Sequence, residues 1–159
     1  LNVVPPLLST KEWEEYANED AEHRIDEVFS ISGVGTVVGG TLLRGSVRQG
    51  DELLLGPNDN GKFRPVTISS IHRNRMPCNF ATAGQTACVS LSTTDQWSVR
   101  KGMVLLSPRL TPEACYEFEA DVYLLFHSNY ICKGFQTVIH VGNVRQTATI
   151  INMNKVGLD

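Results

Sequence analysis

EVFSISGVGTVVGG, residues 27–40, is the stretch of sequence that decides the fold. Its first five residues hold β-branched and aromatic side chains, and the Ser-Gly-Val-Gly sequence of residues 32–35 suits a tight turn. Thr36 then opens a second β-rich run that continues to Leu43. The stretch therefore predicts two antiparallel strands joined by a hairpin.

Further short strands are predicted between this hairpin and Pro108. Asn58-Asp59-Asn60-Gly61 separates two of them with residues that accept a positive φ. The additional predicted strands are Leu53–Leu55, Val66–Ile71, Gln85–Leu91 and Met103–Leu106. About six or seven short strands divided by turn residues are typical of a small closed antiparallel β-barrel. We assign residues 21–107 to this barrel and expect an all-β fold.

Residues 1–20 differ in composition from the barrel. They carry five acids against one lysine and open with an apolar segment that contains Pro5-Pro6. We interpret them as a linker from a separate preceding domain. The alternative is a short acidic helix over Lys11 to Asn18 that packs on the barrel through Trp13 and Tyr16.

A second β-rich unit is predicted in residues 108–159. Its expected strands are Tyr116–Phe126, Phe135–Val141 and Val144–Met153. They amount to the first half of a second β-barrel, and an unclosed barrel exposes unpaired strand edges. We therefore expect self-association through this unit.

Composition and charge exclude several classes of protein. The net charge is −3, yet residues 21–107 carry nine bases against seven acids, which permits contact with phosphate without demanding it. No apolar run is long enough to span a bilayer, and the four scattered cysteines lack the two-residue spacing of metal or redox pairs. We expect a cytoplasmic part of a larger protein, with reduced thiols, no metal and no membrane partner.

Residues 27–40 closely resemble the opening hairpin of the second domain of elongation factor Tu and related translational GTPases, and the resemblance extends over residues 22–107. Supporting phrases are Arg44-Gly45, Gly50-Asp51, Ala83-Gly84-Gln85-Thr86-Ala87 and Arg100-Lys101-Gly102-Met103. Other phrases resemble the GTP-binding protein 1 and 2 subfamily in particular: Ser70-Ile71-His72-Arg73-Asn74-Arg75-Met76-Pro77, Ser107-Pro108-Arg109-Leu110 and Arg145-Gln146-Thr147-Ala148-Thr149-Ile150. The resemblance implies a barrel of the domain II type followed by part of domain III.

The sequence has no glycine-rich phosphate loop that ends in Gly-Lys-Ser or Gly-Lys-Thr. We therefore expect no catalytic residues and no cofactor in this chain. The resemblance places GTP and magnesium in a separate GTPase domain, and it makes the parent protein a GTPase.

The resemblance implies that the barrel helps to hold the 3′ end of tRNA against the GTPase domain. His72, Arg75 and Thr86 fall on pocket positions that carry a glutamate, an arginine and an asparagine in the better-known factor, so only the arginine is kept. Arg73 lies beside them in the sequence, and an arginine pairs well with phosphate or packs against a base. The alternative for this basic cluster is a solvated strand end.

Two more segments are expected to contact RNA. Ser32, Gly33, Val34 and Gly35 match a loop that faces the ribosome in relatives, although the two glycines also suit a simple hairpin turn. Lys133 opens a stretch similar to the tRNA-facing part of domain III. The predicted function is thus an RNA- and ribosome-contacting barrel; the alternative is a protein-interaction barrel that docks its own GTPase domain or a partner protein.

Overall fold

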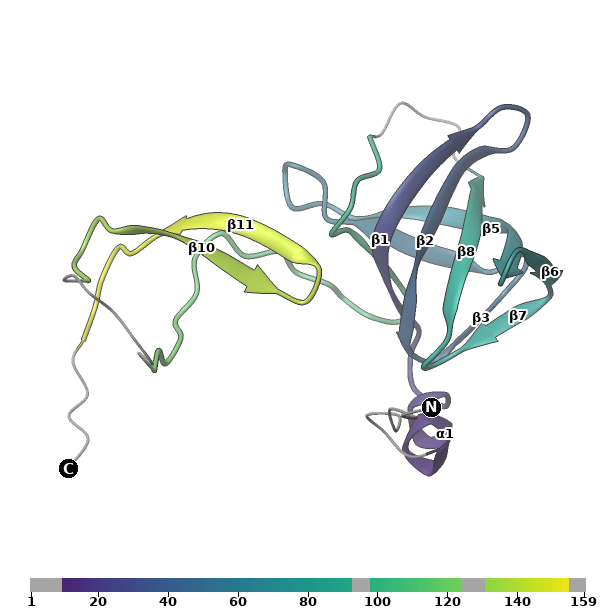
Figure 1. Cartoon of the computed structure of the whole chain (residues 1–159), viewed down its shortest axis with the longest axis horizontal. Helices are drawn as coiled ribbons and strands as arrows, with labels where there is room; N and C mark the ends of the chain where they lie inside the picture. Colours follow the sequence, from purple (N-terminus) through teal and green to yellow (C-terminus); the bar gives the residue numbers. More distant parts are fainter. Residues whose placement is uncertain (1–9, 93–97, 124–130, 155–159) are drawn as a thin grey trace, which may run out of the picture. The chain divides into compact units, whose positions relative to one another are not determined.

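One short helix and eleven strands make up the parts of the chain that the structure, a computed structural model, describes: residues 10–92, 98–123 and 131–154. The chain divides into two compact units, residues 1–114 and 115–159 (Figure 1). The first unit holds helix α1 and strands β1 to β9, and the second holds β10 and β11. The predicted domain boundaries at residues 20 and 107 stay predictions.

Six antiparallel strands close the barrel of the first unit (Figure 1). They are β1 (Glu22–Ile31), β2 (Gly35–Arg44), β4 (Glu52–Gly56), β5 (Arg64–Arg73), β8 (Thr86–Ser92) and β9 (Val104–Leu106). Their order is β4-β9-β1-β2-β8-β5, and β5 pairs again with β4. This ring confirms the predicted closed antiparallel barrel, and closure leaves no open edge within it.

Three short strands were not predicted. β6 (Met76–Cys78) pairs with the end of β5, while β3 (Ser46–Arg48) pairs with β7 (Phe80–Thr82) in a separate small sheet. Runs of three residues carry too little alternation to distinguish a strand from a loop. These strands gather at one end of the barrel, beside the last residues of β5 (Figure 1).

The β1–β2 hairpin has the predicted form. Val28 lies opposite Val38, and the amide of Val34 donates to the carbonyl of Ile31 at 3.0 Å across the turn. Gly33 and Gly35 adopt φ of 80° and 97°, which glycine accepts without steric cost. The hairpin continues beyond the rest of the barrel in Figure 1.

The barrel interior is apolar. Alternate residues of every long strand point inward and bury branched side chains against one another. The largest fully buried ones are Ile25, Val38, Leu42, Val47, Leu55, Ile68, Ile71, Val89 and Leu105, together with His23.

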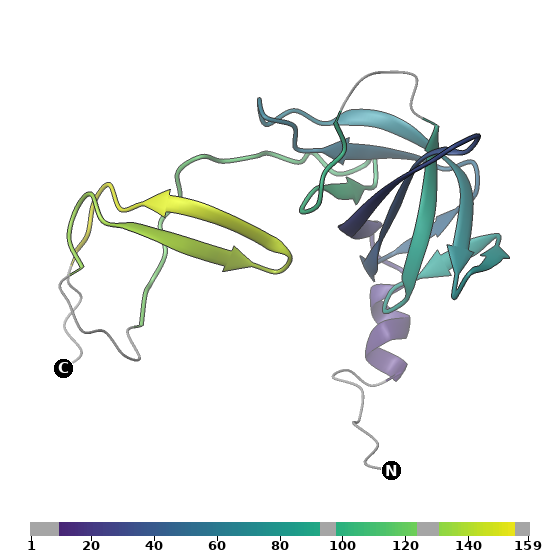
Figure 2. The same ribbon diagram turned by 45° about the horizontal axis from the view of Figure 1, so that its top comes forward.

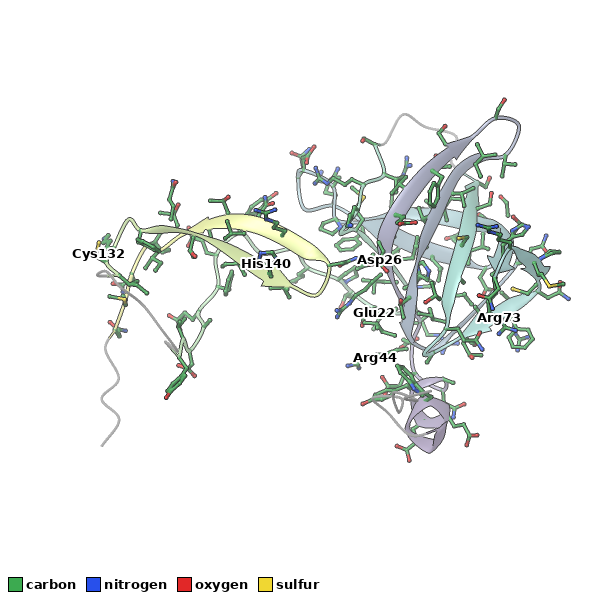
Figure 3. The ribbon with its side chains drawn as sticks, viewed as in Figure 1. Glu22, Asp26, Arg44, Arg73, Cys132 and His140 are labelled. Carbon is green, nitrogen blue, oxygen red and sulfur yellow. The ribbon has the colours of Figure 1, made fainter. Side chains whose placement is uncertain are left out.

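Helix α1 (Thr10–Tyr16) packs on the barrel (Figure 2), as the alternative interpretation of this segment proposed. A Cβ atom on Gly84 would lie 2.8 Å from Trp13 Cδ2, so the indole covers the turn before β8. The Gly45 amide donates to the Tyr16 carbonyl at 2.7 Å, which caps the end of the helix. Arg44, at the end of β2 (Figure 3), pairs with Glu19 at 3.0 Å and ties the residues after α1 to the barrel.

The second unit contains one hairpin, β10 (Gln136–Val141) and β11 (Val144–Thr149). The prediction of a strand over Tyr116–Phe126 was wrong for residues 116–123, which form no strand; residues 124–126 lie outside the described ranges. Tyr116, Phe118 and Tyr123 are exposed, and a strand needs a neighbouring ladder to satisfy its backbone groups. That the hairpin is half of a barrel, and that it self-associates, stay predictions.

Candidate nucleic-acid interface

A row of aligned residues crosses the outer face of the barrel from β1 to β6. Strand register places Glu27 opposite Gly39, Gly39 opposite Cys88, Cys88 opposite His72, and His72 opposite Pro77. Directly opposed residues point to the same side of a sheet. Gly39 and Cys88 are the two small residues between Glu27 and His72, and they form a low floor in the row.

His72 and Thr86 share this outer face. Thr86 stands two residues before Cys88 on β8, which makes it the diagonal neighbour of His72, and both side chains are exposed. Diagonal neighbours across a sheet lie about 7–8 Å apart, close enough to contact one ligand. The structure therefore brings these two predicted site residues together.

Arg73 and Arg75 lie at the end of the same strand pair. Arg73 is the last residue of β5 and is paired with Met76, at the edge of the barrel beside β6 (Figure 3). It follows His72 in the strand, so the two side chains leave the sheet on opposite sides. Asn74 and Arg75 form the turn, with φ of 51° and 66°. Both guanidinium groups are exposed and form no ion pair with any described residue, so they are available to phosphate.

Phe29 also lies on this face and was missed in the sequence. It alternates with inward-facing Val28, and it is 42% exposed. A Cβ atom on Gly39 would lie 3.7 Å from Phe29 Cε2 and 3.5 Å from Cys88 Sγ, so the ring borders the floor of the row. The sequence did contain a signal for Phe29, because it is an aromatic residue at an outward position of a strand whose residues alternate between the two faces.

The remaining predicted contacts belong to two other segments of the chain. Val34 is exposed at the tip of the β1–β2 hairpin, where neither neighbouring glycine has another atom near its Cβ position. Lys133 is exposed in the second unit, in a turn that the Phe135 amide closes by donating to the Cys132 carbonyl at 3.0 Å. The turn at residues 32–35 is confirmed; that it faces the ribosome stays a prediction.

A cavity of about 340 Å³ lies away from the row. Its lining includes Glu19, Asp20, Asp51 and Glu52 together with Arg109. Four carboxylates repel a phosphate chain, so this cavity is unsuited to RNA. Among the described residues no group of histidine, cysteine and acidic side chains can hold a metal ion, and the same residues include no helix that could span a bilayer.

Comparison with known proteins agrees with this architecture. Residues 35–106 match the family described as Elongation factor Tu domain 2. In the crystal structure of apo translation elongation factor SelB from Methanococcus maripaludis, the similar region covers 60% of this chain and 20% of that one, with 27% identity and a TM-score of 0.53.

Curated relatives match almost the whole chain. GTP-binding protein 2 of Mus musculus and of Homo sapiens is 47% identical over 150 residues, which are 94% of this chain and 25% of the relative. GTP-binding protein 1 of Xenopus laevis is 45% identical over 155 residues, 98% of this chain and 23% of that protein. The chain thus spans about a quarter of the length of these relatives. Residues 35–106 thus match the elongation factor Tu domain 2 family, in a chain that is similar over nearly its whole length to part of GTP-binding proteins 1 and 2.

Proposed function

We propose that the outer face of the barrel binds the single-stranded 3′ end of tRNA and helps to position it next to a GTPase domain. The observation that carries this proposal is the juxtaposition of exposed His72, Thr86 and Phe29 around the low floor of Gly39 and Cys88. Single-stranded RNA is recognised by stacking of bases on aromatic side chains and by hydrogen bonds to base edges and ribose hydroxyls. The face offers both kinds of group.

Each residue has a distinct role in the proposal. The Phe29 ring and the His72 imidazole flank the floor and stack on a base or hydrogen-bond to a ribose hydroxyl. Thr86 adds a hydroxyl that donates or accepts. Arg73 and Arg75 pair with the phosphates that enter from the β5–β6 end.

The parent protein in this proposal is a cytoplasmic GTPase that acts on the ribosome. The names of its relatives support the binding of GTP, and the name of its structural neighbour supports a place in translation. Its GTPase domain holds GTP and magnesium, while this barrel is non-catalytic. The β1–β2 tip, Ser32 to Gly35, faces ribosomal RNA, and Lys133 contacts tRNA from the second unit.

A second candidate function is docking of protein. Ile31 and Val34 expose apolar side chains at the uncharged tip of the β1–β2 hairpin, and such a surface suits an apolar groove on a partner or on the GTPase domain. The dependence of binding on salt concentration distinguishes the two functions. Binding through phosphates weakens steeply with ionic strength, whereas apolar docking does not.

Arg75→Asn tests the RNA proposal. Asparagine suits the positive φ of this turn position, so the variant removes a charge without straining the backbone. We expect weaker binding of a single-stranded RNA that ends in CCA, with the slope of log K against log salt reduced by about 0.7. Fluorescence anisotropy between about 50 and 200 mM salt measures both quantities.

The matched control is Lys62→Ala, which removes one positive charge from the loop between β4 and β5. It should leave the slope unchanged. Equal affinity and equal slope for Arg75→Asn and the parent chain would contradict the assignment of Arg75.

A further inference from the structure

An exposed aromatic ring and an exposed arginine face each other on the small β3–β7 sheet. Phe80 lies directly opposite Arg48, and 55% of Phe80 is exposed. The next pair, Ala81 opposite Val47, points into the core and is buried. Phe80 and Arg48 therefore stand on the same outer side, and the core does not require the ring.

This pair adjoins the end of the proposed RNA site. The Gln49 amide donates to the Asn79 carbonyl at 3.1 Å, which ties the residue after β3 to the connection between β6 and β7. Strand β6 in turn pairs with the end of β5, where Met76 lies opposite Arg73 and is 70% exposed. We call Arg48, Arg73, Arg75, Met76 and Phe80 the β6–β7 patch.

The charge of the β6–β7 patch is wholly positive. It holds three arginines and no acid, and none of the three guanidinium groups forms an ion pair with a described residue. The Asp51 carboxylate does lie near Arg48, but the contact between them is a hydrogen bond that Asp51 Oδ2 accepts from the backbone amide of Arg48 at 2.7 Å. Arginines near an exposed ring are typical of surfaces for single-stranded nucleic acid, where rings stack on bases and arginines follow the phosphates.

We propose that the β6–β7 patch is a second binding site for single-stranded RNA, in which Phe80 stacks on a base and Arg48 pairs with the phosphate beside it. This inference rests on the proposed function of the outer face. The RNA leaves the row at His72 and Pro77, turns around the edge strand β6, where Met76 and Arg73 project to the other side of the strand pair, and reaches Phe80. An RNA longer than the few nucleotides that fit the row is then held at both places.

Phe80→Ala tests the stacking contact. A single-stranded RNA of about eight nucleotides that ends in CCA is long enough to occupy both the row and the β6–β7 patch. We expect the variant to bind it about five- to tenfold more weakly than the parent chain, because loss of one stacked base lowers affinity by at least this factor. The salt slope should not change, since no phosphate contact is lost. Phe80→Trp keeps a ring at the position and should restore the affinity.

Arg48→Ala tests the phosphate contact independently. It should reduce the slope of log K against log salt by about 0.7, while Lys62→Ala leaves the slope at the parent value. A trinucleotide CCA should bind the Phe80→Ala variant and the parent chain equally, because it fills only the row.

Three outcomes separate the two proposals. If Phe80→Ala binds the longer RNA with unchanged affinity while His72→Ala binds it more weakly, the proposal for the β6–β7 patch is overturned and the proposal for the row stands. Weaker binding by Phe80→Ala with no effect of His72→Ala supports the β6–β7 patch and overturns the row. Absence of RNA binding by the parent chain overturns both.

Discussion

Gly40→Ala is expected to destabilise the barrel severely. A Cβ atom on Gly40 would lie 1.7 Å from the carbonyl oxygen of Arg24 and 2.8 Å from its carbonyl carbon. Both are backbone atoms of the paired strand β1, so no side-chain rotation relieves the overlap. The strands have to separate where the register shifts between Ile25 and Glu27. We expect a loss of about 4 kcal/mol or more in the free energy of unfolding, measured by urea denaturation.

The neighbouring glycine provides the matched control. A Cβ atom on Gly39 would meet Cys88, Phe29 and Glu27 at 3.5 to 3.8 Å, which is ordinary van der Waals contact. Gly39→Ala should therefore be as stable as the parent, or more stable by up to about 1 kcal/mol through lower chain entropy in the unfolded state. Equal stability of the Gly39→Ala and Gly40→Ala variants would show that the β1–β2 approach is not as close as described.

Acid is expected to destabilise the barrel through His23. This side chain is fully buried; its Nε2 atom lies 3.4 Å from the Ala87 carbonyl oxygen, and Nδ1 has no hydrogen-bond partner among the described residues. Burial lowers the pKa of His23 below 6.5, outweighing the backbone hydrogen bond to Ala87 and the attraction of Asp26, which both raise it. The folded barrel thus holds this imidazole neutral.

The direction in which stability changes with pH follows from proton uptake by the unfolded chain. Below pH 6.5 the unfolded chain protonates His23 while the folded chain does not, so stability is full above that pH and decreases as the pH falls. The decrease is up to about 1.4 kcal/mol per pH unit for one proton. Urea denaturation between about pH 7 and pH 5 measures it. His23→Gln, which cannot titrate, should flatten the curve at some cost in stability at neutral pH. An unchanged slope in His23→Gln would contradict this role.

The barrel was predictable because its long strands carry clear alternation and its turns carry glycine and asparagine. The pattern of residues 27–40 predicted the right hairpin: the first strand ends at Ile31 as expected, and the second begins at Gly35, one residue before the predicted Thr36. The predicted strand after Pro112 failed for the residues described there, because propensity for β-structure does not supply a partner strand. Residues 116–118 and 122–123 have the composition of a strand and yet form none.

The candidate site was predictable only in part. His72 and Thr86 were identified through the family resemblance, whereas Phe29 was missed because its place depends on which strand lies across Gly39. Phe80 and Arg48 are far apart in the sequence and come together only through the pairing of two three-residue strands. Such pairings depend on closure of the whole barrel, and local sequence patterns do not contain them.

The most direct test of the central claim is a nuclear magnetic resonance titration of the 159-residue chain with a single-stranded RNA that ends in CCA. Binding at the outer face predicts that the backbone amide signals of Gly39, His72, Thr86 and Cys88 shift together and saturate with one dissociation constant. The amide of Lys62 should not move. Shifts confined to the β1–β2 tip or to the second unit, with these four amides unchanged, would contradict the claim that this face of the barrel binds RNA.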